Sequence, residues 1–232
     1  MNLFEAIETR RSVRKYLKEA VPRAVMEKAL QAALLAPNSS NLQPWEFYWV
    51  TSAEKKARLV TACLDQATAA TAAELVVFVA RTDTWRRNRK LILDVLHQRG
   101  NPAKQQLDYY QKIVPLFYTH GWLGVTGLLK RLVFPIVGWF RPVPRGPFSR
   151  TRLQGMLNKT VALACENFML AITAQGYSTC PMEGFDEQRV KRILGLGREA
   201  TITMVISVGK EDPAGIYGAR LRLDPKLFVF EV

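Results

Sequence analysis

The sequence is poor in the residues that build metal centres and disulfide frameworks. It contains three cysteines, Cys63, Cys165 and Cys180, and two histidines, His97 and His120. An odd number of widely spaced cysteines without a CxxC pair argues against both a disulfide framework and a structural zinc site. Neither histidine has a partner at metal-binding spacing, so each is expected to be an ordinary surface or core residue. The cysteines suit a reducing compartment, and a cytoplasmic location is predicted.

Several catalytic signatures are also missing. There is no GxxxxGK[ST] phosphate loop, no GxSxG elbow and no HExxH pair, which leaves a kinase, a serine hydrolase and a zinc protease without support. The GLG at 195–197 lacks a third glycine and follows a helical pattern, so it is not a dinucleotide fingerprint. The opening MNLFEAIETRR carries acidic residues and no apolar core, which does not fit a secretory signal.

Acidic residues are absent from one long segment. Residues 109–165 contain no Asp or Glu, and the middle of this segment is apolar, aromatic and basic. The run 122–140 approaches the roughly 20 residues that a membrane-spanning helix needs. Lys130 and Arg131 lie inside it, however, and such a pair costs several kcal/mol at the bilayer centre, so no span is predicted. Two interpretations stay open: a lid packed on a partner subunit, or a segment at 120–150 lying on an anionic membrane surface.

The rest of the composition is that of a folded, strongly basic protein. Of 232 residues, 48% are hydrophobic, which is enough for a sizeable core. The net charge of +13 attracts anions such as nucleotides, nucleic acid, acidic substrates or anionic lipid. We expect a single domain over residues 1–232, with an atypical apolar and basic insertion at about 100–155.

Helical and strand patterns mix along the chain, which predicts an α+β fold. A buried strand is indicated by the continuous apolar run LVVFVA, and a long helix is expected to end at Gly176. The predicted helices are 3–9, 25–35, 54–72, 156–175 and 187–194, and the predicted strands are 47–51, 75–80, 201–208 and 227–232.

Three short stretches are candidates for a ligand site. Arg10, Arg11 and Ser12 can fork onto one phosphate, although a basic cluster is also typical of a solvated helix end. The stretch APNSSNLQPW at 36–45 offers amides and hydroxyls to a heterocycle, or forms a connecting turn. The stretch PMEGF at 181–185 has a glycine that lets a backbone N–H approach a flat ligand, or that makes a tight turn.

Together, and in this order, the three stretches resemble the FMN-dependent nitroreductase family. The resemblance covers about residues 1–81 and 156–232 and includes the LVVFVA strand, the long helix, a strand ending at Gly209 and a late Arg220. It implies a mixed sheet flanked by helices, with a long central helix in the interface of a homodimer. It also implies FMN at that interface, touched by both chains.

The resemblance implies the cofactor contacts as well. The FMN phosphate and ribityl chain are expected to be held by Arg10, Arg11, Ser12 and Arg220. The ring is expected to be approached from the other subunit by Pro37, Asn38, Ser39 and Asn41, and to be lined by Pro181 and Met182. The backbone of Glu183 and Gly184 is expected near flavin N5, so that no side chain acts as a catalytic acid or base.

The chain departs from the family pattern at positions close to the ring. Many members carry a lysine near flavin N1 and O2, where this sequence has Gln66 and Thr68, and Gln66 is expected to contact the cofactor there. Another family lysine, two places before the late arginine, is replaced by Gly218, for which Arg222 is a candidate substitute. The segment 82–155 is longer than in compact members and unlike them.

The implied activity is that of an FMN-dependent NAD(P)H oxidoreductase. NADH or NADPH would deliver hydride to flavin N5, and a nitroaromatic, quinone or similar small-molecule acceptor would then be reduced, in a ping-pong cycle. One alternative is a flavin-destroying or reductive-dehalogenating member of the same fold. The other is a non-enzymatic basic protein that binds a membrane or nucleic acid through residues such as those at 85–90. This non-enzymatic interpretation is the least favoured, because it gives 36–45 and 181–185 no role.

Overall fold

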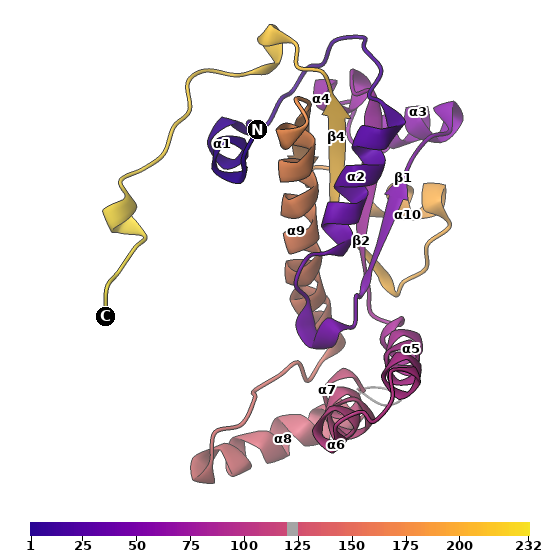
Figure 1. The fold of residues 1–232 in the computed structure, drawn as a ribbon, viewed down its shortest axis with the longest axis vertical. Coiled ribbons are helices and arrows are strands. Elements are labelled where there is room, and N and C mark those ends of the chain that lie inside the picture. The colour runs from indigo at the N-terminus through magenta and orange to yellow at the C-terminus, as the bar shows by residue number, and fades with distance from the viewer. Residues whose placement is uncertain (120–124) are drawn as a thin grey trace.

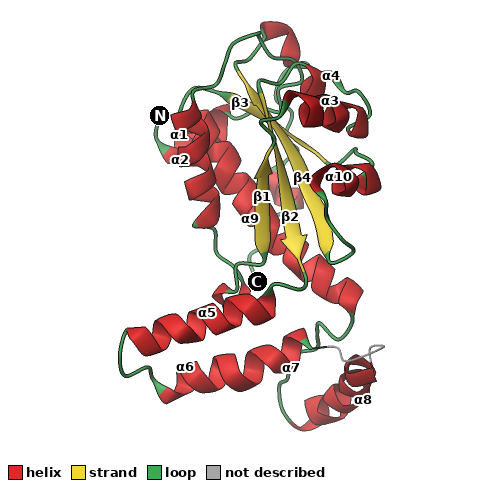
Figure 2. Ribbon diagram, turned by 90° about the vertical axis from the view of Figure 1, so that its right-hand side faces the viewer, coloured by secondary structure: helices red, strands yellow, loops and turns green. Residues whose placement is uncertain are grey.

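A four-stranded antiparallel sheet forms the centre of the molecule (Figure 2). The computed structural model describes residues 1–119 and 125–232. Its strands are β1 (Trp45–Trp49), β2 (Glu74–Arg81), β3 (Ser178–Met182) and β4 (Ala200–Gly209), in the order β1-β2-β4-β3. An isolated parallel bridge joins Ser12 to Thr179 beside β3. The predicted α+β class is confirmed.

Helices cover both faces of this sheet. One face packs against α2 (Arg23–Leu34) and the long α9 (Arg150–Ala174), and α1 (Leu3–Thr9) lies against the outer side of α9 (Figure 1). The other face packs against α3 (Ala53–Ala62), α4 (Ala67–Ala70) and α10 (Glu187–Leu194). The core is therefore two apolar layers, one on each side of the strands.

Strand β2 shows why the sequence gives a sheet buried on both faces. Val76, Phe78 and Ala80 point into the α9 layer, whereas Val77 and Val79 point into the opposite layer, and all five are buried. Successive side chains of a strand point to opposite faces, so a continuous apolar run is what a strand between two helical layers requires. Aromatic packing of Phe78 on Phe47 and Phe168 ties β1, β2 and α9 together.

The long helix begins and ends at recognisable signals. The Ser149 side chain accepts a hydrogen bond from the backbone N–H of Arg152, which caps the N-terminus of α9. After the helix, Gly176 adopts φ 82°, a left-handed conformation that glycine reaches without steric cost. The predicted stop at this glycine is thus confirmed, and the helix begins six residues earlier than the predicted position 156.

The atypical middle segment forms a helical group at the end of the molecule beyond β1 and β2 (Figure 1). It consists of α5 (Trp85–Gln98), α6 (Lys104–Asp108), the π-helical turn η2 (Tyr109–Ile113), α7 (Val114–Tyr118) and α8 (Val125–Phe140). His120, Trp122 and the rest of 120–124, part of the segment considered for membrane contact, lie outside the described residues. None of the helices in the described ranges combines the length and apolarity needed to cross a bilayer.

Two sequence-based predictions of secondary structure need correction. Residues 54–72 are not one helix, because Leu64 and Asp65 adopt left-handed backbone conformations (φ 60° and 50°) that separate α3 from α4. Residues 227–232 are not a strand: they follow the 3₁₀ turn η5 (Pro225–Leu227) in an extended tail that leaves the body and pairs with no strand of the described chain (Figure 1).

Candidate cofactor site

The basic stretch after α1 is held along the open edge of β3. The backbone N–H of Val13 donates to the carbonyl of Thr179 at 3.1 Å, next to the Ser12–Thr179 bridge. Val13 and Tyr16 are buried, and the Tyr16 hydroxyl lies 2.9 Å from the Ser207 hydroxyl of β4. Burial raises the pKa of Tyr16, which keeps it a neutral anchor. These two anchors fix the residues between and before them, so that Ser12 and its basic neighbours face outward.

Gly215, from the C-terminal region, packs directly against the backbone of Arg14 and Lys15. The N–H of Arg14 donates to the carbonyl of Gly215 at 2.8 Å. A Cβ at position 215 would lie 2.4 Å from the Lys15 carbonyl oxygen, which is closer than real Cβ contacts allow. Glycine at 215 therefore permits the close approach that brings residues 217–222 beside residues 10–14.

An arginine-lined pocket of about 230 Å³ results from this approach. Arg11 donates to the carbonyl of Gly218 at 2.9 Å, Arg220 donates to the carbonyl of Arg10, and Arg14 lies over the Tyr217 ring at 5.0 Å. The lining residues of the pocket are Arg10, Arg11, Ser12, Arg14, Tyr217, Ala219, Arg220, Leu221 and Arg222. Five guanidinium groups and no carboxylate line it within the described chain, although Arg10 also pairs with Glu166 at 3.7 Å. Such a pocket favours an anion.

A second cleft, of about 340 Å³, continues from the arginine pocket. The two share Ser12, Arg14 and Tyr217 in their walls. The remaining walls are built by Gln66, Ala67 and Thr68 around the start of α4 and by residues 180–184 at the end of β3. The sequence positions predicted to contact one ligand from residues 10–12, 66, 181–184 and 220 are therefore brought together.

The turn at Glu183 and Gly184 is held in place by the neutral side chain of Gln66. The Gln66 amide nitrogen donates to the carbonyl of Gly184 at 2.6 Å and to the carbonyl of Cys63 at 2.8 Å. Among the hydrogen bonds of the described residues, none uses the N–H of Glu183 or Gly184 as its donor. These exposed N–H groups are thus available to a ligand in the cleft, which is the feature that a flavin ring nitrogen needs.

The predicted contacts from 37–41 lie elsewhere in the chain. Pro37, Asn38, Ser39 and Asn41 line neither the arginine pocket nor the cleft beside it. Their loop leads into β1, whereas the turn at 183–184 follows β3, and these strands are the two opposite edges of the sheet. Three strand spacings of about 4.8 Å separate those edges by about 14 Å. Within one chain the loop and the cleft do not meet.

This loop is held in a strained shape by the helical group. Ser40, Asn41 and Gln43 adopt φ values of 58°, 49° and 47°, a region that non-glycine residues seldom occupy. The Ser40 hydroxyl bonds to the Tyr109 hydroxyl at 2.7 Å, and Asn88 of α5 donates to the Gln43 carbonyl at 3.1 Å. Backbone strain of this kind persists only where surrounding contacts maintain it, and it is concentrated at functional sites.

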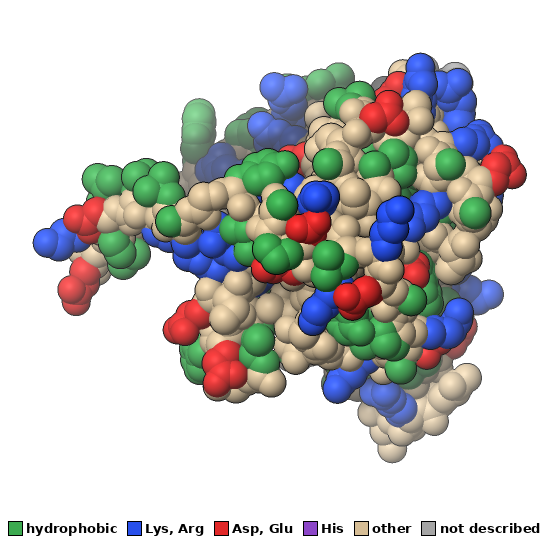
Figure 3. Space-filling view, turned by 90° about the horizontal axis from the view of Figure 1, so that it is seen from above, with side chains coloured by type: hydrophobic (Ala, Val, Ile, Leu, Met, Phe, Trp, Pro, Cys, Tyr) green, Lys and Arg blue, Asp and Glu red, His purple; other side chains and the backbone are tan. Residues whose placement is uncertain are grey.

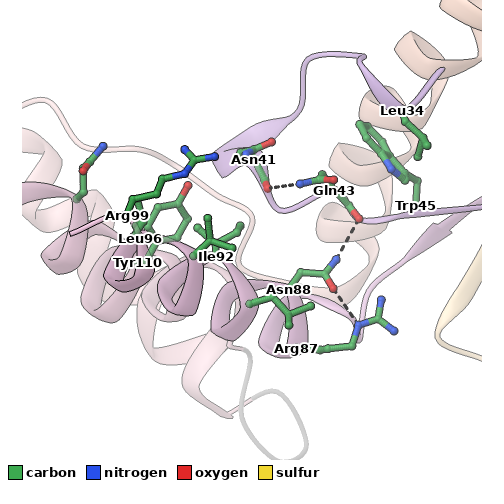
Figure 4. Close-up of a pocket in the computed structure, with 13 residues that line it drawn as sticks. Leu34, Asn41, Gln43, Trp45, Arg87, Asn88, Ile92, Leu96, Arg99 and Tyr110 are labelled. Atoms are coloured by element: carbon green, nitrogen blue, oxygen red, sulfur yellow. Dashed lines mark hydrogen bonds between the residues drawn. The ribbon is translucent and has the colours of Figure 1, made fainter. Parts of the chain in front are cut away.

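A wider groove of about 690 Å³ runs between this loop and α5 (Figure 4). One wall is an aliphatic row from α5 that includes Leu91, Ile92 and Val95, and the opposite wall includes Asn41 and Trp45. Figure 4 shows the Arg99 guanidinium extended toward Asn41 over this space. The groove combines an apolar wall with a cation at its rim, which suits a flat or apolar molecule carrying an anionic group.

Arg14, Thr68 and Tyr217 are site residues that the sequence analysis did not assign to the cofactor. Arg14 lines both cavities, and its signal was present: it stands two places after Ser12, and alternate residues of an extended segment share a face. Thr68 donates to the Val13 carbonyl at 3.2 Å and so joins α4 to the basic stretch. Tyr217 had no local signal, because its position depends on the approach at Gly215.

The comparisons with known proteins agree with this geometry. A sequence model described as the nitroreductase family matches residues 7–123 and 141–210, and the chain belongs to that family. It is 26% identical over 215 residues to a Thermus thermophilus protein named NADH dehydrogenase, a match that covers 93% of this chain and 89% of the relative. The family and the names of its relatives define an oxidoreductase.

Solved structures show the same fold. The Bacillus subtilis protein YdfN matches with a TM-score of 0.77 at 22% identity, covering 99% of this chain and 98% of its own. A protein of Exiguobacterium sibiricum, solved in complex with FMN, matches with a TM-score of 0.71 at 24% identity, covering 100% of this chain and 98% of its own. The nitroreductase fold is thereby established for this chain.

Proposed function

We propose that this protein is an FMN-dependent NAD(P)H oxidoreductase that reduces a nitroaromatic, quinone or similar acceptor in a ping-pong cycle. The observation that best supports this is one continuous space with five guanidinium groups at one end and two uncommitted backbone N–H groups at the other. A ligand with a phosphate at one end and a flat, hydrogen-bonding ring at the other matches both ends. A cytoplasmic location suits the three free and buried cysteines.

The arginine pocket would hold the phosphate. Arg10, Arg11 and Arg220 can donate charge-assisted hydrogen bonds to a phosphate dianion, and the Ser12 hydroxyl adds a neutral one. Arg11 and Arg220 are already oriented within the chain, because each donates to a backbone carbonyl of the neighbouring segment, and Arg10 pairs with Glu166. That orientation lowers the conformational entropy lost on binding.

The cleft beside it would hold the ring. Pro181 and Met182 offer an apolar wall, and the N–H groups of Glu183 and Gly184 offer donors at its edge. When bound, FMN supplies the hydride acceptor and donor that the nicotinamide and the final acceptor require. Arg14, which lines both cavities, is our candidate for the cation that many family members provide with the lysine near flavin N1 and O2. Gln66 instead orients the turn.

We further propose a homodimer in which the loop at 37–41 of one copy completes the cleft of the other. The support is that the two parts lie apart within one chain while large apolar surfaces stay exposed. These surfaces include Phe4 of α1, Leu163 of α9 and Phe228 in the extended tail. Figure 3 shows hydrophobic side chains along the tail where it projects from the body. In such a dimer Pro37, Asn38, Ser39 and Asn41 would approach the ring from the partner.

The groove between α5 and that loop would then lie next to the ring and receive the acceptor. Removal of the Arg99 cation tests this assignment. We expect Arg99→Ala to lower kcat/KM for a nitrobenzoate about tenfold, and to leave kcat/KM for the uncharged nitrobenzamide nearly unchanged, since an exposed charged hydrogen bond is worth about 1.4 kcal/mol. Arg58→Ala, on the far side of the sheet, is the matched control. Equal losses for both acceptors would contradict the assignment.

The first experiment on the function itself is spectroscopic. The purified chain is titrated with FMN, and NADH or NADPH is then added under nitrogen while flavin absorbance is followed. The proposal expects saturable FMN binding and bleaching by one of the two nicotinamides at catalytic rates, with dithionite as the control for a reducible bound flavin. A chain that binds no FMN, or whose bound FMN is bleached by dithionite and by neither nicotinamide, would refute the proposed activity.

A further inference from the structure

Helix α8 leaves a long apolar face uncovered. Leu128, Leu132, Ile136, Trp139 and Phe140 are exposed, the last two at 83% and 84%. Their spacing of three and four residues places them on one side of the helix. Leu129 and Val133 widen the same face. At 1.5 Å per residue the 16-residue helix is about 24 Å long, so this is a continuous apolar stripe and not a set of scattered side chains.

The opposite side of α8 is fixed to the body. Phe134 packs on Phe117 of α7 and on Phe148 in the chain that returns to α9, with ring centroids 6.4 and 4.8 Å apart. The Lys130 ammonium donates to the carbonyls of Leu116 and Thr119. The apolar stripe is therefore presented outward by a packed and hydrogen-bonded inner side.

The charged residues of this segment are exclusively basic. Residues 125–152 carry one lysine and five arginines, and no Asp or Glu occurs anywhere in 109–165. Lys130 is directed inward, Arg150 pairs with Glu199 at 2.9 Å, Arg152 belongs to α9 and the Arg145 guanidinium packs on Gly138, which leaves Arg131 within α8 and Arg141 at its end. Any surface that covers the stripe must therefore accept these positive charges without a compensating carboxylate from this segment.

The position of α8 also suits contact with a large flat object. In Figures 1 and 2 the helix lies at the end of the molecule farthest from β3 and α4, and in Figure 1 its axis runs across that of α9. The helix is thus able to lie in a plane without the sheet domain touching that plane. It is separate from the arginine pocket, which lies at the other end of the molecule beside β3.

We propose that α8 docks flat on an anionic phospholipid membrane. The stripe from Leu128 to Phe140 enters the headgroup–acyl boundary, Trp139 sits at the interface where its ring is favoured, and Arg131 and Arg141 contact lipid phosphates. Charge complementarity selects this occupant over the same face of a second copy, since that contact would bring two acid-free, arginine-bearing segments together.

Vesicle binding by the full-length protein tests the proposal. Co-sedimentation is measured with phosphatidylcholine vesicles and with vesicles that contain phosphatidylglycerol. We expect partitioning only onto the anionic vesicles, and its reversal by added salt. Ile136→Glu and the pair Arg131→Glu with Arg141→Glu should each lower the partition coefficient at least about tenfold. Leu64→Ser, an exposed apolar residue between α3 and α4, is the control that should leave vesicle binding unchanged.

A variant that does not fold would also lose vesicle binding. Circular dichroism and oligomeric state are therefore recorded for Ile136→Glu and for the charge-reversal pair. The charge-reversal pair leaves the apolar stripe intact, which keeps the test valid if Ile136→Glu does not fold. Absence of the wild type from the anionic vesicles would overturn the proposal. It would also be overturned if Ile136→Glu dissociated a dimer while vesicle binding stayed unchanged, because the stripe would then belong to a second copy. Neither vesicle binding nor oligomeric state depends on flavin turnover, so the membrane proposal is tested independently of the proposed activity.

Discussion

Removal of the Arg220 guanidinium should weaken FMN binding through the phosphate alone. Arg220 lines the arginine pocket and donates to the carbonyl of Arg10. A hydrogen bond to a charged group contributes about 1.5–3 kcal/mol. Arg220 is exposed in the single chain, so we expect the lower part of that range for Arg220→Ala. A loss of about 1.5–2 kcal/mol raises the Kd for FMN about 10- to 30-fold.

The assay compares FMN with riboflavin, which lacks the phosphate. Flavin fluorescence is titrated with wild type, Arg220→Ala and the distant control Arg58→Ala. The weakening by Arg220→Ala should appear for FMN and not for riboflavin, and it should shrink at high ionic strength. The difference between the two ligands isolates the phosphate contact in the manner of a double-mutant cycle.

Two results would refute this reasoning. An equal loss of affinity for FMN and riboflavin would mean that Arg220 acts by holding the backbone at Arg10 and not by contacting the phosphate. No loss for either ligand would mean that the phosphate lies outside the arginine pocket. Unchanged binding in Arg58→Ala is required in both cases, because Arg58 lies on α3 and pairs with Glu54.

Three further predictions concern the body of the protein. Gly215→Ala should lower the free energy of unfolding by about 1–3 kcal/mol in urea titrations, because its Cβ would meet the Lys15 carbonyl at 2.4 Å, whereas Gly155→Ala, which meets nothing within 4 Å, should not be destabilising. Burial raises the pKa of Cys63 to about 12, so iodoacetamide at pH 8 should spare this thiol until denaturant is added; rapid labelling of the native protein would contradict its burial. Hydrogen bonding to the Arg81 guanidinium lowers the pKa of Asp83 below its ordinary value of 3.8, so the folded state binds fewer protons there and its stability should fall as the pH drops below about 4. Asp83→Asn should reduce this loss of thermal stability at acid pH. An unchanged loss in the variant would contradict the pairing of Asp83 with Arg81.

Local patterns were sufficient for the helices and strands that carry strong periodicity. The run LVVFVA identified β2, and Gly176 identified the end of α9, because a buried strand and a helix stop are each written in neighbouring residues. Strand β3 was missed because STCPM is short, contains a proline and looks like part of the following turn. Its assignment as a strand depends on pairing with β4, which no local window contains.

The candidate site divides in the same way. Arg10, Arg11 and Ser12 were found as a local cluster, and the structure places them beside the turn at 183–184, yet their role as cofactor ligands stays a prediction. The family resemblance predicted that Arg220 would join this cluster, but no local pattern indicated that residues 217–222 would reach it. That approach depends on a tertiary contact at Gly215, across about 200 residues of chain.

The expected strand at 227–232 is wrong for a related reason. Its run of Phe228, Val229 and Phe230 is typical of a strand, but the tail leaves the body and pairs with no strand of the described sheet. The β3 edge is already occupied by residues 12–13. Sequence patterns record a preference for extended backbone, whereas the partner for that backbone is decided by the whole fold.

The stretch along β3 has a consequence for aggregation and for exchange with solvent. An open strand edge is a template for pairing with other chains, and Ser12 and Val13 cover this one at Thr179. Ser12 also lines the arginine pocket, between Arg11 and Arg14. An anion bound there therefore also holds the edge of the sheet shut, since a ligand that binds only the closed form stabilises it by mass action. Amide hydrogens of Thr179 and its neighbours should exchange more slowly when the pocket is filled, and loss of the ligand would expose the edge on which self-association begins.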